Sequence, residues 1–152
     1  MSNTRKTIGG LREITRLFAV QVMYGADILQ KPIAEVLTHE YLNKSVVISE
    51  EIFLDTVDTV FLKGLLDEYS AHATLIDEII LKHLSRKWTI DRLNKVLIAV
   101  LRLGITELLY LDTPANVAFN EYIEISKAYF QKSEVAFVNG ILNSAYKENS
   151  EK

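Results

Sequence analysis

The sequence predicts an all-α fold. Apolar residues recur every three or four positions along most of the chain, the spacing that gathers them on one face of a helix. Strict alternation of apolar and polar residues, which indicates a half-buried strand, is almost absent. The chain has 152 residues, of which 49% are hydrophobic, and this is enough for one ordinary globular domain with a sizeable core.

The first helix is predicted to end at about Leu29. Residues 1–10 precede it as a basic leader that contains Gly9-Gly10, and we expect this leader to be flexible. The apolar face of the helix comprises Ile14, Leu17 or Phe18, Val22 (or Gln21) and Leu29. A short second helix is predicted to start at Lys31-Pro32, because proline in the first turn removes no hydrogen bond that would otherwise form.

Residues 41–49 interrupt the helical pattern. We predict a loop here, because Val46-Val47-Ile48 has no second strand to pair with. Ser49, followed by two glutamates, is a suitable N-cap for the next helix. The apolar stripe of that helix comprises Phe53, Val57, Val60 or Phe61, Leu65 and Tyr69. A further helix is predicted from His72 to about Lys87, where cations suit the C-terminal end.

The central helix is predicted to have Thr89 as its N-cap. It is apolar round most of its circumference, which is typical of a helix in the middle of a bundle. Its narrow polar strip comprises Lys95, Arg102 and Thr106. Gly104 is a candidate break that would divide this helix into two pieces.

Two more helices complete the chain. Thr113-Pro114 marks the start of the first, whose core-facing residues are predicted to be Val117, Phe119, Ile123 and Ile125. Ser133 is predicted to open the second. Asn139-Gly140 is ordinarily a hairpin signal, but helical spacing continues through it. We therefore place Gly140 inside the helix, at a close approach whose packing offsets a propensity cost of roughly 1 kcal/mol.

A distributed pattern of residues resembles a known family. Its parts are Arg16 to Tyr24, Leu75-Ile76-Asp77, Trp88, Asp91-Arg92-Leu93, Leu101-Arg102, Glu107-Leu108-Leu109, Pro114, Asn120-Glu121, Lys127 and Phe137-Val138-Asn139-Gly140. In order and spacing this pattern resembles the NusB family of bacterial transcription antitermination factors. The resemblance implies a NusB-like all-α fold of two small helical bundles packed into one compact unit. We accordingly expect one domain over residues 11–147 and a polar tail over residues 148–152.

Composition excludes several classes of protein. The chain has no cysteine, so it has no disulfide and no thiol nucleophile, which fits a reducing cytosol. No apolar segment precedes a small-residue cleavage site, so we predict no secretory signal. The longest apolar run, Val96 to Ile105, contains Arg102 and is too short to span a bilayer. We expect a soluble cytoplasmic protein with no membrane partner.

The residue pattern does not favour an enzyme, a metal site or a cofactor. His39, His72 and His83 are scattered, without the spacing of metal ligands. Adjacent carboxylates such as Glu50-Glu51 point away from each other on a helix. A NusB-like domain also occurs fused to ribosomal-RNA cytosine methyltransferases. We expect no cofactor-binding domain of that kind here, and the chain lacks the cysteine on which their chemistry relies.

Charge is distributed unevenly along the chain. The net charge is −3, yet residues 1–16 carry Arg5, Lys6, Arg12 and Arg16 against Glu13 alone. A basic segment on an acidic body favours a localised anionic partner over general coating by nucleic acid. The alternative is that a short basic N-terminus has no partner, which is common.

The resemblance implies that basic residues at the start of the first helix bind boxA RNA. Arg12 and Arg16 match two of those basic positions and lie one helical turn apart, so both can reach one stretch of RNA. Glu13 and Ile14 stand where the family often carries further arginines, so the basic patch is thin. The alternative is that Arg12 and Arg16 are merely a solvated pair.

A second cluster lies at the predicted junction of the last two helices. Lys127, Tyr129, Phe130, Lys132 and Ser133 interleave aromatic and basic side chains, which suits base stacking and attraction to phosphates. The family pattern places acidic residues in many relatives where Lys132 and Ser133 stand. The alternative is that Phe130 belongs to the core and that the lysines are only exposed charges.

Other polar residues have predicted structural roles. Asn120, Glu121 and Asn139 lie inside apolar helices and are expected to link neighbouring helices by buried hydrogen bonds. Trp88 and Arg92 are expected to cover the junction between the two halves.

The resemblance implies a function by assembly. We expect the chain to bind boxA-type leader RNA and the ribosomal protein NusE, and to modify the elongation of RNA polymerase within an antitermination complex, chiefly on ribosomal-RNA operons. A homodimer is a further candidate assembly. The alternative function is a protein–protein interaction or dimerisation module without direct RNA specificity, which the acidic body favours.

Overall fold

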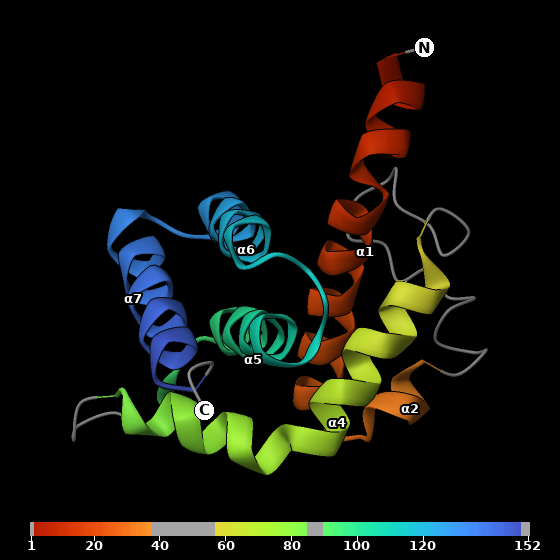
Figure 1. Cartoon of the computed structure of the whole chain (residues 1–152). Coiled ribbons are helices and arrows are strands. Elements are labelled where there is room, and N and C mark those ends of the chain that lie inside the picture. The colour runs from red at the N-terminus through yellow and green to blue at the C-terminus, as the bar shows by residue number, and fades with distance from the viewer. Residues whose placement is uncertain (1, 38–56, 85–89, 150–152) are drawn as a thin grey trace. The chain divides into compact units, whose positions relative to one another are not determined.

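The computed structural model describes residues 2–37, 57–84 and 90–149, and every regular element in these ranges is a helix (Figure 1). The elements are α1 (Ser2–Leu29), α2 (Ile33–Val36), α4 (Thr59–Lys82), the short 3₁₀ helix η2 (Ile90–Arg92), α5 (Lys95–Tyr110), α6 (Ala115–Tyr129) and α7 (Lys132–Asn149). The predicted all-α fold is confirmed. The predicted loop at 41–49, the caps at Ser49 and Thr89, and the residues His39, Phe53 and Trp88 lie outside the described ranges.

The chain divides into two compact units, Met1–Leu66 and Asp67–Lys152. In the first unit α1 ends at Leu29 as predicted, where Gln30 adopts a φ of 56°. The backbone is helical from Ser2, so the segment predicted to be a leader continues the helix. Once the buried part of α1 has formed, extending it avoids the cost of a new nucleus. Pro32 immediately precedes α2 as its N-cap.

α4 consists of two helical segments joined by a kink, and the sequence predicts two helices here. It contains a kink at His72, whose φ of −122° and ψ of 18° are not helical. The His72 ring stacks on Tyr110, with ring centroids 3.7 Å apart, and its Nδ1 lies 3.0 Å from the carbonyl oxygen of Glu68. A side chain that competes for a carbonyl of the helical ladder is an identifiable cause of a kink. The predicted boundary at His72 is therefore confirmed as a kink between two helical segments.

In the second unit α5 packs against α6 and α7, which also contact each other (Figure 1). Its N-cap is Asn94, whose Oδ1 accepts hydrogen bonds from the backbone N–H groups of Val96 at 2.8 Å and Leu97 at 3.2 Å. The helix therefore begins later than predicted. It also runs unbroken through Gly104. Because this glycine has no side chain, α5 can approach its neighbours closely there.

Buried and partly buried polar groups link α5 to its neighbours. Arg102 donates through Nε and Nη2 to the two carboxylate oxygens of Asp77 in α4, each at 2.9 Å. Glu107 is 0% exposed, and its carboxylate accepts hydrogen bonds from Tyr122 at 2.7 Å and from Thr113 at 2.6 Å. A buried carboxylate needs such donors to replace the water that it loses.

The buried links predicted at Asn120 and Asn139 are wrong, because both residues are exposed. Glu121 is only partly exposed and does interact with other groups. Arg92, predicted to cover a junction, is exposed. Sequence patterning marks a polar residue among apolar ones, but it does not say which of them points inward.

α6 begins after Pro114 as predicted, but its core-facing side differs from the prediction. The buried residues are Ala118, Tyr122, Ile125 and Ser126. Val117 is 41% exposed, and Phe119 and Ile123 are half-buried. Ser126 can be buried because its hydroxyl donates to the carbonyl oxygen of Tyr122 at 2.8 Å. A prediction from apolar residues alone overlooks a serine whose hydroxyl makes its hydrogen bond within its own helix.

Gly140 lies inside α7, so the helix prediction at Asn139-Gly140 is confirmed, but the predicted close approach is wrong. A Cβ at Gly140 would meet nothing within 4 Å. The close approach occurs at Gly104, where a Cβ would lie 2.9 Å from Leu142 Cδ2 and 3.4 Å from Tyr122 Cγ. The close approach predicted at Gly140 of α7 thus occurs at Gly104 of α5 instead.

The two glycines should respond oppositely to alanine. We expect Gly140→Ala to raise the free energy of unfolding by about 0.5–1 kcal/mol, since alanine is the better helix former and space is open. We expect Gly104→Ala to lower it by about 1–3 kcal/mol, because the core must move to accept a methyl group. Urea unfolding followed by circular dichroism measures both. Equal stability of the two variants would show that the Leu142 side chain moves away from the added methyl group without loss of unfolding free energy.

Candidate nucleic-acid interface

Two contacts hold the Arg12 side chain at the surface of the first unit. Its guanidinium carbon lies 4.6 Å from the ring centroid of Phe61, and its Nε lies 4.0 Å from Asp58 Oδ2. The Arg12 side chain is still 58% exposed. An arginine stacked on an aromatic face keeps its outward N–H groups available for a phosphate or a base.

Arg16 occupies a different environment from Arg12. Its guanidinium carbon lies 5.1 Å from the same Phe61 ring, so the two arginines share one face as predicted. Arg16 is only 3% exposed, which leaves little surface for an RNA contact. Arg16 is placed to support the Phe61 ring, and this ring in turn supports Arg12.

The start of α4 fixes the ring on which Arg12 rests. Asp58 Oδ1 accepts from the backbone N–H of Phe61 at 3.0 Å, as an N-cap does. The backbone N–H of Asp58 donates to Thr15 Oγ1 on α1 at 2.8 Å. These bonds hold the first turn of α4 against α1, so Arg12 and Phe61 are brought together by segments far apart in the sequence.

The second predicted cluster lies at the turn from α6 to α7, in the second unit. Lys127 and Tyr129 are exposed near the end of α6, and Lys132 and Ser133 are exposed at the start of α7. α7 begins one residue before the predicted Ser133, because Glu134 Oε1 accepts from the backbone N–H of Gln131 at 3.0 Å.

The aromatic residues of this cluster are adjacent. The Tyr129 and Phe130 ring centroids are 6.1 Å apart, and Tyr129 is 41% exposed. Burial of part of its ring raises the pKa of the Tyr129 phenol. Phe130 is half-buried, so it is neither free nor part of the closed core.

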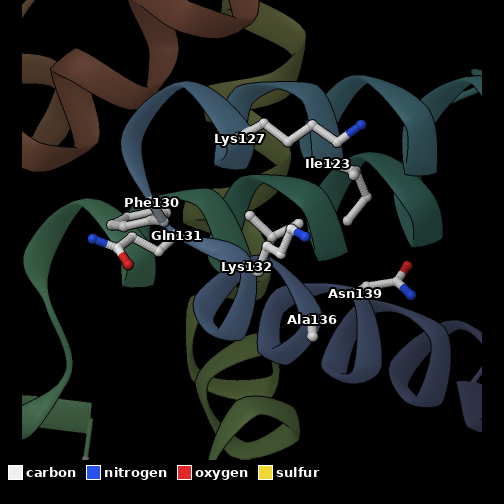
Figure 2. Close-up of a pocket in the computed structure, with 8 residues that line it drawn as sticks. Ile123, Lys127, Phe130, Gln131, Lys132, Ala136 and Asn139 are labelled. Atoms are coloured by element: carbon white, nitrogen blue, oxygen red, sulfur yellow. The ribbon is translucent and has the colours of Figure 1, made fainter.

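A groove of about 800 Å³ runs between α6 and α7 beside this cluster (Figure 2). Its lining residues are Ile123, Lys127, Phe130, Gln131, Lys132, Val135, Ala136 and Asn139. The groove contains three members of the predicted cluster, whereas Tyr129 and Ser133 are not among its lining residues. The sequence analysis did not predict the five other lining residues as part of a site. Lining residues recur every three or four positions along two helices joined by a short turn, and this spacing could have indicated a shared face.

Charge in the groove differs from that of the whole chain. Its lining contains two lysines and no carboxylate, whereas the chain carries a net charge of −3. Lys127 Nζ lies 3.0 Å from Glu124 Oε2, but both side chains are more than half exposed, so water and salt screen this pair strongly. The groove therefore favours an anionic ligand.

The described residues contain no group of three or more His, Cys, Asp or Glu residues that could hold a metal ion. His72 stacks on Tyr110, and His83 Nε2 lies 3.2 Å from Glu148 Oε2. Across the same described ranges, no helix is both long enough and apolar enough to cross a membrane.

Comparison of the sequence with known proteins gives one consistent result. The model of the NusB family matches residues 13–147. The transcription antitermination protein NusB of Enterococcus faecalis is 34% identical over 149 residues, covering 97% of this chain and 94% of that protein. NusB of Caulobacter vibrioides is 34% identical over 136 residues, covering 88% and 90% respectively.

Solved structures give the same result for the fold. NusB of T. maritima superposes with a TM-score of 0.73 at 29% identity, covering 91% of this chain and 92% of that one. A crystal structure of antitermination factors NusB and NusE in complex with double-stranded RNA has a TM-score of 0.71 at 29% identity, covering 90% and 96%. The solution structure of NusB from Aquifex aeolicus has a TM-score of 0.70 at 32% identity, covering 93% of each chain.

Proposed function

The chain belongs to the NusB family, and we propose on that premise that it is a transcription antitermination factor that binds boxA-type RNA together with the ribosomal protein NusE. The relatives that it matches over most of their length are transcription antitermination proteins. One relative of known structure is bound to NusE and to double-stranded RNA. The observation of this chain that carries the proposal is Arg12, held exposed on the Phe61 ring.

We assign the RNA contacts to two surfaces, one on each unit. Arg12 contacts phosphate on the first, with Arg16 supporting it through Phe61. Lys127, Lys132, Tyr129 and Ser133 contact RNA on the second, where lysines attract phosphates and an exposed ring offers a stacking surface. This division keeps all six residues predicted from the sequence but gives Arg16 an indirect role.

The function follows from assembly and involves no bond chemistry. RNA and NusE, joined on this helical scaffold, alter the elongation of RNA polymerase in the cytoplasm, chiefly on ribosomal-RNA operons. Because the chain carries a net charge of −3, its long-range attraction to RNA is weak. NusE supplies further phosphate contacts and orientation, so RNA affinity rises in its presence.

Titration of labelled boxA-type RNA with the protein, alone and with NusE, tests the proposal. We expect modest affinity alone, a clear gain with NusE, and weaker binding by Arg12→Ala. The slope of log affinity against log salt should flatten by about 0.7 for the phosphate contact that Arg12→Ala removes. Thermal unfolding checks that the variant remains folded.

Lys31→Ala is the matched control, since Lys31 is an exposed cation of the same helical unit. It should leave both the affinity and the salt slope unchanged. If RNA binds neither to the protein alone nor to its mixture with NusE, while NusE itself is bound, the chain is instead a protein-interaction module. The acidic body of the chain is the observation that favours this second function.

A further inference from the structure

We propose that the groove between α6 and α7 holds one unstacked nucleotide, with its base between the helices and its phosphate beside Lys132. The inference rests on the proposed function, and it adds a base-reading site made by residues outside the predicted cluster. Its central claim is that Gln131 and Asn139 distinguish a nucleobase from an abasic sugar. A base contact would then be made here, apart from the phosphate contact at Arg12.

The walls of the groove suit a flat, apolar ligand surface. Ile123 and Phe130 contribute from α6 and its end, and Val135 and Ala136 contribute from α7 (Figure 2). The volume of about 800 Å³ lies within the range of small-ligand pockets. A base enters such a space only after leaving its stack, and contact with an apolar or aromatic wall then replaces the stacking that is lost.

The polar groups of the groove suit the edge of a base. Figure 2 shows Gln131 and Asn139 at opposite ends of the groove, with Lys132 between them. Each amide offers both donors and an acceptor, the combination that a nucleobase edge presents in return. Asn143 Nδ2 donates to Asn139 Oδ1 at 3.0 Å and thereby orients that amide. Both amide residues are exposed, so a ligand can reach them.

Charge and shape together favour a nucleotide over an acidic peptide. Lys132 attracts any anion, and Lys127 does so in competition with Glu124, which does not line the groove. A carboxylate side chain would use this charge but would leave the apolar walls of the groove uncovered. A nucleotide uses the apolar walls, the amides and the charge at once.

The test compares boxA-type RNA with copies that carry one abasic ribose at each position in turn, all bound to the full-length protein with NusE. For the wild type, one abasic position should weaken binding by about tenfold, since one stacked base is lost. Ala136→Phe fills the groove, so this variant should bind the intact and abasic RNAs equally. Asn139→Ala should reduce the same ratio without filling the groove, while Lys132→Ala should flatten the salt slope and keep the ratio.

Ala128→Phe is the matched control, because Ala128 is exposed on α6 and does not line the groove. It should keep the wild-type ratio. A wild-type ratio in both Ala136→Phe and Asn139→Ala, with RNA still bound, overturns the groove inference and leaves the proposed function standing. Loss of NusE binding by Ala136→Phe with an unchanged RNA profile assigns the groove to a protein and also overturns it. No RNA binding by the wild type under any condition overturns both.

Discussion

Glu107→Ala is expected to lower the free energy of unfolding by about 3 kcal/mol. The substitution removes the acceptor of the Tyr122 hydroxyl, and Tyr122 is itself 0% exposed. A buried donor without a partner costs about 1–3 kcal/mol, and the space left by the side chain adds to this loss. Urea unfolding at neutral pH measures the change. The midpoint should fall with little change in its dependence on urea.

Two further variants separate the hydrogen bonds from the cavity. Tyr122→Phe removes the donor, so combining it with Glu107→Ala should cost less than the sum of the single changes. Glu78→Ala is the matched control, since Glu78 is exposed on a helix of the same unit. If Glu107→Ala costs no more than Glu78→Ala, the carboxylate does not fix the packing of α5 and α6.

Elements were predictable where local chemistry decides them. α1 ends at Leu29 and α6 begins after Pro114, because a proline acts within a few positions of each of these helix ends. The start of α5 was missed because its N-cap is Asn94 and a short 3₁₀ helix precedes this residue. The 3₁₀ turn has no distinct apolar spacing that would separate it from α5 in the sequence.

The environment of side chains was less predictable, because distant segments decide it. Arg12 and Arg16 have the same chemistry and lie one turn apart, yet one is largely exposed and the other is buried. The difference depends on tertiary contacts, among them Phe61 from α4, and no property of α1 alone specifies it. The groove likewise combines residues of α6 and α7, so the cluster predicted from neighbouring residues in the sequence captured only Lys127, Phe130 and Lys132 at and beside the turn.

Reversing the charge at the start of α7 should weaken RNA binding by about tenfold or more. The double variant Lys132→Glu with Ser133→Asp removes one phosphate contact and places two carboxylates beside the proposed RNA surface. Loss of the contact alone should flatten the salt slope by about 0.7, and repulsion should lower the affinity further. RNA titration over a range of salt concentrations, with NusE present, measures both quantities.

Unfolding is not an adequate explanation for such a loss, because both positions lie in the first turn of α7 and are exposed. Carboxylates near a helix N-terminus interact favourably with the helix dipole, so the variant should be at least as stable as the wild type. Lys147→Glu with Ser70→Asp makes the same change in charge at exposed residues of the same unit that do not line the groove. If this control weakens RNA binding as much as the double variant at Lys132 and Ser133, the effect is one of net charge and the RNA does not lie against the start of α7.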